Sequence, residues 1–152
     1  MKYLILCLIF IFSLISRVNA QNTNITLNSD LSLTCKFEKV ILKNADYNFE
    51  SFTKDQIQRK DIDKLLIESK KPDILIVKNL SEFFNKIDLE VKILNKDIFL
   101  IQAFDKERNY SESAVYTRKT GELSHEITIN IKQEEKEKDI SFYSCKNNNK
   151  DT

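Results

Sequence analysis

Hydrophobic and polar side chains alternate along most of the chain after residue 30, and this two-residue period is typical of strands with one buried face. In the segment 122–133, for example, Leu123, His125 and Ile127 are expected to point inward, with Glu126 and other polar side chains outward. The same pattern, or a short apolar run, predicts strands over 31–40, 73–78, 89–94, 98–104, 113–119 and 139–146. Short polar segments separate most of them, so we expect neighbouring strands to be mostly antiparallel.

These elements predict a mainly β fold, a small antiparallel meander that closes toward a barrel or a sandwich. Such a fold buries the inward faces and leaves few strand edges exposed. The only glycine of the chain, Gly121, follows Thr120 between two predicted strands, where a turn most often needs a positive φ. No repeat or linker divides the chain, so we expect one domain over 31–146, a flexible lead-in over 21–30 and a disordered tail over 147–152.

One segment departs from the two-residue period and predicts a helix at about 54–70. Thr53 and Gln56 fit a capping box, in which the glutamine side chain reaches back to the amide of the capping threonine. The apolar positions that follow have helical spacing, and Pro72 would end the helix. The alternative is a pair of short strands with a polar turn at 60–61.

The first twenty residues predict a signal peptide. Lys2 gives a short basic start, an almost unbroken apolar run covers 3–15, and Val18 and Ala20 place small side chains at the −3 and −1 positions of a cleavage site. The run is shorter than the roughly 20 residues of a membrane-spanning helix. We therefore expect export and cleavage, with an uncleaved N-terminal anchor as the alternative. The abundance of lysine, asparagine and isoleucine indicates an AT-rich, bacterial source, and hence a periplasmic or secreted protein.

Cleavage would leave two cysteines, Cys35 and Cys145, and an even number of cysteines in an exported chain predicts a disulfide bond. The bond would close a loop of about 110 residues, which the chain-entropy relation converts to a stabilisation on the order of 4–5 kcal/mol. Two free thiols and an intermolecular bridge are the alternatives. Two distant cysteines and one histidine do not make a cluster of metal ligands, so we expect no metal and no cofactor.

The charge of the chain argues against nucleic acid as a partner. The formal charge is +1, and removal of Lys2 and Arg17 leaves 22 basic against 23 acidic side chains, a charge of −1. Binding to a phosphate backbone needs a clear excess of lysine and arginine.

Catalytic motifs are also missing from the sequence. One glycine cannot build a glycine-rich phosphate loop, and neither a Gly-x-Ser-x-Gly elbow nor a Cys–His nucleophile arrangement occurs. An enzyme would need a cleft in which His125, the only histidine, meets a carboxylate. Acidic pairs such as Glu107 with Glu112 give no sign of burial, so we expect no enzymatic activity.

The aromatic residues are spread over most of the predicted elements, which indicates core packing. The alternative is that Phe99, Tyr116 and Phe142 line the inside or the mouth of a barrel that holds a small apolar ligand.

Three local sequences carry a resemblance to known proteins. Arg-Lys-Thr-Gly-Glu-Leu at 118–123, with Leu-Thr-Cys at 33–35 and Tyr-Ser-Cys at 143–145, resembles the layout of small uncharacterised exported bacterial β-domains. That resemblance implies no known activity. The segment 111–116 is also loosely similar to the inhibitory loop of periplasmic C-type lysozyme inhibitors, which are small β-barrels with a cysteine near each end. Here the glycine of that loop is missing, and Val115 stands where the family has a basic residue.

The second resemblance implies a protein partner, engaged by insertion of the segment 110–116 into its cleft. The contact residues would be Tyr110, Ser111, Ser113 and Tyr116. We therefore expect an exported, non-catalytic binding module for a protein partner. A carrier of a small apolar ligand and a structural envelope protein are the alternatives.

Overall fold

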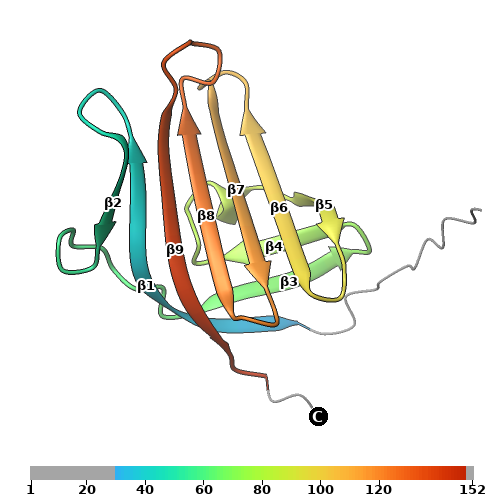
Figure 1. The fold of residues 1–152 in the computed structure, drawn as a ribbon. Helices are drawn as coiled ribbons and strands as arrows, with labels where there is room; N and C mark the ends of the chain where they lie inside the picture. Colours follow the sequence, from blue (N-terminus) through green and yellow to red (C-terminus); the bar gives the residue numbers. More distant parts are fainter. Residues whose placement is uncertain (1–29, 150–152) are drawn as a thin grey trace, which may run out of the picture.

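The computed structural model describes residues 30–149, and this part of the chain forms one antiparallel sheet of nine strands (Figure 1). The strands are β1 (Leu31–Lys43), β2 (Asn48–Thr53), β3 (Leu65–Lys71), β4 (Ile74–Lys78), β5 (Leu89–Leu94), β6 (Ile98–Asp105), β7 (Tyr110–Thr117), β8 (Glu122–Ile129) and β9 (Glu137–Asn147). A single 3-10 turn, η2 (Phe84–Lys86), interrupts the meander. The predicted signal peptide and residues 21–29 and 150–152 lie outside the described residues. None of the helical turns within 30–149 has the length or apolar character to cross a membrane.

The strands follow the order β2-β1-β3-β4-β5-β6-β7-β8-β9, and β1 also pairs with β9. Eight strands therefore close into a barrel, with β2 attached outside the closure. The prediction of a mainly β fold that closes toward a barrel is confirmed.

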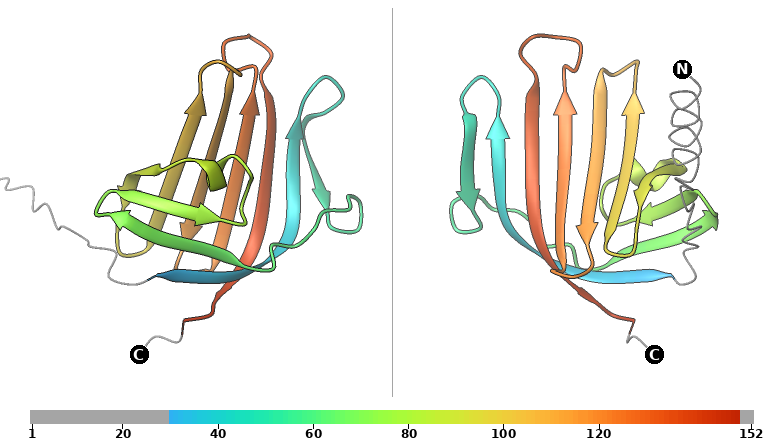
Figure 2. Two further views of the ribbon diagram at one scale, coloured as in Figure 1. Left: turned by 180° about the vertical axis from the view of Figure 1, so that it is seen from behind. Right: turned by 45° about the vertical axis from the view of Figure 1, so that its right-hand side comes forward.

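Strand β1 is bent, and the bend allows its two ends to pair with different strands (Figure 2). Its residues 31–33 pair with β3, its residues 39–43 pair with β2, and β9 runs along it from residue 33 to residue 43. A register shift between Phe37 and Lys39 marks the bend. Between the two pairings, the connector from β2 to β3 supplies the acceptors: Cys35 N–H donates to the Ile62 carbonyl at 3.0 Å, and Phe37 N–H donates to Asp61 Oδ1 at 3.1 Å. The backbone of β1 thus stays hydrogen-bonded at residues 35 and 37 on the edge opposite β9, where no strand pairs with it.

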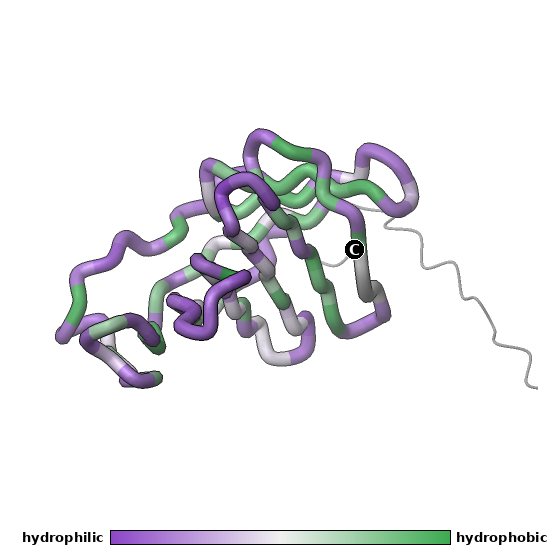
Figure 3. Tube along the Cα trace, turned by 90° about the horizontal axis from the view of Figure 1, so that it is seen from above, coloured by the Kyte–Doolittle hydropathy of each residue, from purple (hydrophilic) through white to green (hydrophobic). Residues whose placement is uncertain are grey.

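Inward side chains fill the barrel. Leu33, Phe84 and Phe99 are buried among residues from eight strands and the 79–88 segment, and a cavity of only about 10 Å³ lies between the core side chains. In a view along the strands, hydrophobic positions recur on the strands while the turns are mostly hydrophilic (Figure 3). The alternation in the sequence is therefore the inside–outside alternation of a closed sheet.

The predicted helix at about 54–70 is wrong. Residues 54–64 form a connector, and β3 begins at Leu65. The capping contact does exist: Gln56 Oε1 accepts the Thr53 amide at 2.8 Å, but only one turn follows it. Tertiary packing overrides the local signal because Leu65 and Ile67 alternate into the core, where they help to close the barrel. The alternative of a pair of short strands is right only for the second strand, β3, because residues 60–61 lie in the connector and no strand precedes them within 54–64.

The strand β7 begins at Tyr110, three residues before the predicted start, because the preceding turn is tighter than expected. Asp105 Oδ1 accepts the amides of Glu107 and Arg108 at 3.0 Å each, and Asn109 adopts a φ of 57°. Asparagine tolerates this left-handed conformation better than most residues. The turn therefore ends at residue 109 and the strand starts at once.

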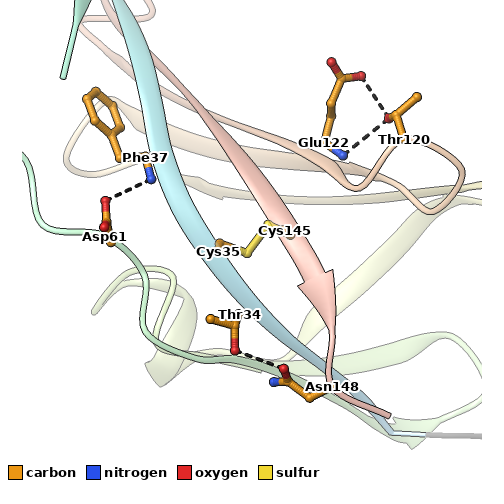
Figure 4. The surroundings of a disulfide bond; sticks show 8 residues. All are labelled: Thr34, Cys35, Phe37, Asp61, Thr120, Glu122, Cys145 and Asn148. Atoms are coloured by element: carbon orange, nitrogen blue, oxygen red, sulfur yellow. Dashed lines mark hydrogen bonds between the residues drawn. A yellow bond between two sulfur atoms is a disulfide. The ribbon is translucent and has the colours of Figure 1, made fainter. Parts of the chain in front are cut away.

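The predicted disulfide is present and joins Cys35 directly to Cys145 across the β1–β9 seam (Figure 4). The two Cα atoms lie 4.0 Å apart. Beyond it, the Asn148 amide donates to the Ser32 carbonyl at 2.8 Å, and Thr34 Oγ1 donates to Asn148 Oδ1 at 3.0 Å. The staple and these bonds fix both ends of the described chain to each other.

Gly121 lies against the backbone of Cys145, one of the two disulfide-bonded residues. Its replacement by alanine is expected to destabilise the fold by about 2–3 kcal/mol. Its φ is +71°, which costs an L-residue about 1–2 kcal/mol. A Cβ atom would also lie 2.5 Å from the carbonyl oxygen of Cys145, whose amide donates to the Gly121 carbonyl at 2.7 Å. Urea unfolding of Gly121→Ala measures the loss.

Gly121→Asn is the companion variant. Asparagine relieves part of the left-handed strain but keeps the contact with Cys145. Similar losses in both variants would assign the effect to the contact. A loss below about 0.5 kcal/mol in Gly121→Ala, the range of a neutral surface substitution, would contradict the prediction.

Candidate functional site

The most unusual chemistry lies at the mouth of the barrel, where strands β6–β9 extend beyond the short strands β3–β5. The segment 79–88, which includes η2, crosses the inner face of the long strands there (Figure 2). Its Phe83 ring meets the Tyr110 ring edge-on at 5.2 Å, and its Phe84 ring lies 6.0 Å from the imidazole of His125. This segment therefore closes most of the mouth with aromatic side chains.

A carboxylate lies under this segment. Glu112 shares the inward face of β7 with Tyr110 and is only 1% exposed. The Tyr110 hydroxyl donates to its Oε1, and His125 Nε2 lies 3.0 Å from its Oε2. The Ser81 hydroxyl is a third partner, and it also accepts the Phe84 amide at 3.0 Å. Glu112 thus joins β7, β8 and the 79–88 segment.

These contacts decide the charge of the site. Burial raises the pKa of Glu112, but hydrogen bonds from His125, Tyr110 and Ser81 outweigh it and hold this pKa below the ordinary value. Burial, and secondarily the neighbouring Glu112, raises the pKa of Tyr110. At neutral pH the mouth therefore contains an ionised buried carboxylate and a neutral phenol.

A pocket of about 590 Å³ opens onto this network. Its chemically distinctive lining residues are Phe83, Lys86, Asp105, Arg108, Tyr110 and Glu112. His125 is 6% exposed and lies behind Phe84, outside the lining of the pocket. A molecule in the pocket would meet the phenol and the carboxylate, but not the imidazole.

His125 therefore does meet a carboxylate within hydrogen-bond reach, as an enzyme would require, but it does so in a sealed position. The sequence missed this pair. The alternation along β7 could have indicated that Glu112 is buried. Glu112 lies two and four residues before Ala114 and Tyr116, and therefore on the same inward face. Within residues 30–149 there is no group of three or more histidine, cysteine or acidic side chains arranged to hold a metal.

The residues predicted to contact a protein partner all lie on β7, which is paired with β6 on one edge and β8 on the other. Ser111 and Ser113 alternate outward, whereas Tyr110 and Tyr116 point inward and Tyr116 is buried. The segment is a central strand and not a projecting loop. Its insertion into a cleft would break two strand pairings.

The three aromatic residues predicted to line a ligand cavity do not come together. Phe99 and Tyr116 are cross-strand partners inside the barrel and border the cavity of about 10 Å³. Phe142 lies on the outer face, with the ammonium of Lys39 5.0 Å above its ring. Since a single water needs about 10–15 Å³, the cavity that Phe99 and Tyr116 border has no room for an organic ligand.

A second polar cluster fixes the connector 54–64 to the inner face of β9. The Arg59 guanidinium bonds to the Asp139 carboxylate and to Ser141 Oγ, the latter at 3.2 Å. Ser141 Oγ in turn donates to Asp139 Oδ1 at 3.0 Å. This half-buried ion pair holds the connector in place, and no pattern in the sequence predicts it.

Strand β2 is the one strand in residues 30–149 that pairs on a single edge. Its Phe49 is 53% exposed and takes a φ of 58°. On the other face of the hairpin the rings of Tyr47 and Phe52 pack edge-on at 4.9 Å. The turn before β2 is closed by Asn44, whose side chain accepts the amides of Asp46 and Tyr47 at 2.9 and 3.0 Å.

Acid is expected to weaken the fold through Glu112. Because its pKa is lower in the folded protein than the ordinary value of 4.5, its stabilising contribution is complete above that value. The contribution is lost as the pH falls through the lower folded pKa, since the unfolded chain then binds the proton more tightly. Urea unfolding between pH 7 and pH 3 measures this slope.

The control is Glu112→Gln, in which the change in unfolding free energy between pH 7 and pH 3 is expected to be smaller than in the unaltered protein. Asp61→Asn removes a partly exposed carboxylate whose pKa is lowered by Lys54 and by the Phe37 amide. It should leave the contribution of Glu112 in place. An identical acid slope in Glu112→Gln would contradict the assignment.

Comparison of the chain with protein-family models, curated proteins and solved structures finds no match.

Proposed function

We propose that this protein is an exported, non-catalytic binding module that engages a protein partner through the free edge of β2. The observation that carries the proposal is that one strand of an otherwise closed barrel, in residues 30–149, keeps an unpaired edge beside an exposed aromatic side chain. An extended segment of a partner can add to such an edge, with main-chain hydrogen bonds giving affinity and side chains giving selectivity. The Cys35–Cys145 disulfide supports export, since such bonds persist in oxidising compartments.

The edge lacks two of the usual protections against strand addition. Natural edges are commonly blocked by proline or lysine, by other charged side chains, by bulges or by a covering element. The sequence of β2, Asn-Phe-Glu-Ser-Phe-Thr, contains neither proline nor lysine, while Glu50 and the register shift at Leu42/Lys43 remain. An edge without proline or lysine is accessible to a strand of another chain.

The edge is also rigidly presented. The Tyr47–Phe52 ring contact and the Asn44 turn fix the hairpin, and residues 39–43 of β1 hold β2 along its inner edge. A preorganised strand loses little conformational entropy when a partner adds to it, which favours affinity. Phe49 beside the edge would supply an aromatic anchor of the kind that dominates interface energies.

The alternative of an apolar-ligand carrier has less support. It needs an enclosed apolar cavity, and the described interior leaves only about 10 Å³.

The test begins with photo-crosslinking from position 51 on β2 and from position 113 on β7, followed by binding measurements with the purified partner. Phe49→Ala is expected to weaken binding about tenfold or more, because truncation of an aromatic anchor costs at least about 1.4 kcal/mol. The matched control is Phe104→Ala, since Phe104 is 49% exposed on β6, a strand paired on both edges. It should bind normally.

Ser113→Arg separates this proposal from insertion of the β7 segment. Full binding by Ser113→Arg and loss of binding by Phe49→Ala support the β2 edge. Crosslinks from position 113 only, with Phe49→Ala binding normally, would overturn it.

A further inference from the structure

We propose that the pocket at the mouth of the barrel binds a primary ammonium group on an apolar stem, with Glu112 as its counter-charge. This inference is independent of the β2 edge. It follows from the charge of the pocket, from its unused hydrogen-bond capacity and from its aromatic wall.

Charge is the first argument. Three carboxylates and two cations line the pocket. The cations already face acids at the exposed rim, Arg108 at 3.6 Å from Asp105 and Lys86 at 3.8 Å from Glu82. Within the described residues no lysine or arginine lies within 4.0 Å of Glu112. The imidazole of His125, 3.0 Å from Glu112, is charged only when it is protonated. An entering ammonium would place a permanent positive charge beside this buried carboxylate, where an uncompensated charge is costly.

The second argument is hydrogen-bond capacity. A carboxylate has about four acceptor positions. Tyr110, His125 and Ser81 account for three of them around Glu112. One position remains for a donor, and the residue belongs to the lining of the pocket. An ammonium has three donors and no acceptor, so it matches this position, whereas a second carboxylate would not.

The aromatic wall is the third argument. The rings of Phe83 and Tyr110 meet edge-on at 5.2 Å, and both line the same pocket as the carboxylate. An aromatic face attracts a cation within about 6 Å of the ring centroid. The side chains of Ile87 and Ile127 offer apolar surface for the stem of the ligand. The volume of about 590 Å³ lies within the usual range for small-molecule sites.

An anionic ligand fits these observations less well. It would have to rely on Lys86 and Arg108, whose side chains are 74% and 80% exposed and already pair with acids. Exposed pairs of this kind contribute little, because water and salt screen them.

The test uses the purified disulfide-bonded protein and three probes of one shape: 2-phenylethylamine, 2-phenylethanol and 3-phenylpropionate. Calorimetric titration at pH 7 and low salt is expected to give at least tenfold tighter binding for the amine than for the alcohol. The anion should bind most weakly. N-acetyl-lysine methylamide forms a fourth arm. Its binding would extend the ligand class to lysine side chains of proteins, and its failure beside a binding amine would restrict the class to free amines.

Glu112→Gln is expected to abolish the preference of the amine over the alcohol while leaving binding of the alcohol unchanged. Should that variant fail to fold, Ile127→Lys places a cation in the pocket wall at a half-buried position and should abolish amine binding. Ile98→Lys adds the same charge at the opposite end of the sheet and should retain it. Binding of the alcohol or the anion as tightly as the amine, or amine binding that survives Ile127→Lys, would overturn the proposal.

Discussion

Replacing Cys35 and Cys145 together by alanine is expected to lower the free energy of unfolding by about 4–5 kcal/mol. The two cysteines are 110 residues apart in the sequence and close the β1–β9 seam, so the staple removes a large amount of entropy from the unfolded chain. That loss is a large part of the total stability of about 5–15 kcal/mol expected for a small domain. Urea unfolding measures it, and the slope against urea should increase because the unfolded chain becomes less compact.

Reduction of the unaltered protein is the control, because it breaks the bond without removing core atoms. Both cysteines are buried, so the alanine variant also loses a small amount of packing. The reduced protein should therefore be slightly more stable than the double variant. A loss below about 1 kcal/mol on reduction would contradict the entropic role of the bond.

Glu112→Leu is expected to destabilise the protein by about 3–5 kcal/mol, the cost of breaking a buried charged network at one partner. Leucine has a similar size but leaves Tyr110, His125 and Ser81 without their acceptor. The 79–88 segment then loses its polar attachment to β7 and β8. Urea unfolding gives the magnitude, and amide hydrogen exchange at residues 81–86 should show faster local opening.

Glu126→Leu is the matched control. Glu126 lies on β8 but faces outward, where its Oε1 bonds to Lys138 at 2.6 Å and to Thr128 at 3.0 Å. A half-exposed ion pair of this kind is worth about 0–1 kcal/mol. Equal losses of unfolding free energy in Glu112→Leu and Glu126→Leu would show that the buried Glu112 network stabilises the fold no more than an exposed ion pair does.

The candidate site was only partly accessible from the sequence. The two-residue period places Glu112 and His125 on inward faces, but it does not say that the two side chains meet. Their contact depends on the diagonal pairing of β7 with β8 and on Ser81, which arrives from a segment some 30 residues earlier. Likewise, the resemblance to an inhibitory loop assigned Ser111 and Ser113 to a projecting segment, whereas both belong to the central strand β7.

What the sequence by itself determined is local: seven of the nine strands, the Thr120–Gly121 turn and the cysteine pair. Alternation along a strand and the backbone demands of a turn are properties of neighbouring residues, and two cysteines allow only one internal pairing. The tertiary structure alone decided that β1 bends and pairs with β2, β3 and β9, that β2 keeps a free edge, and that residues 54–64 form no helix. These outcomes depend on competition between distant segments for the same backbone groups and the same buried space. A local sequence pattern carries no information about that competition.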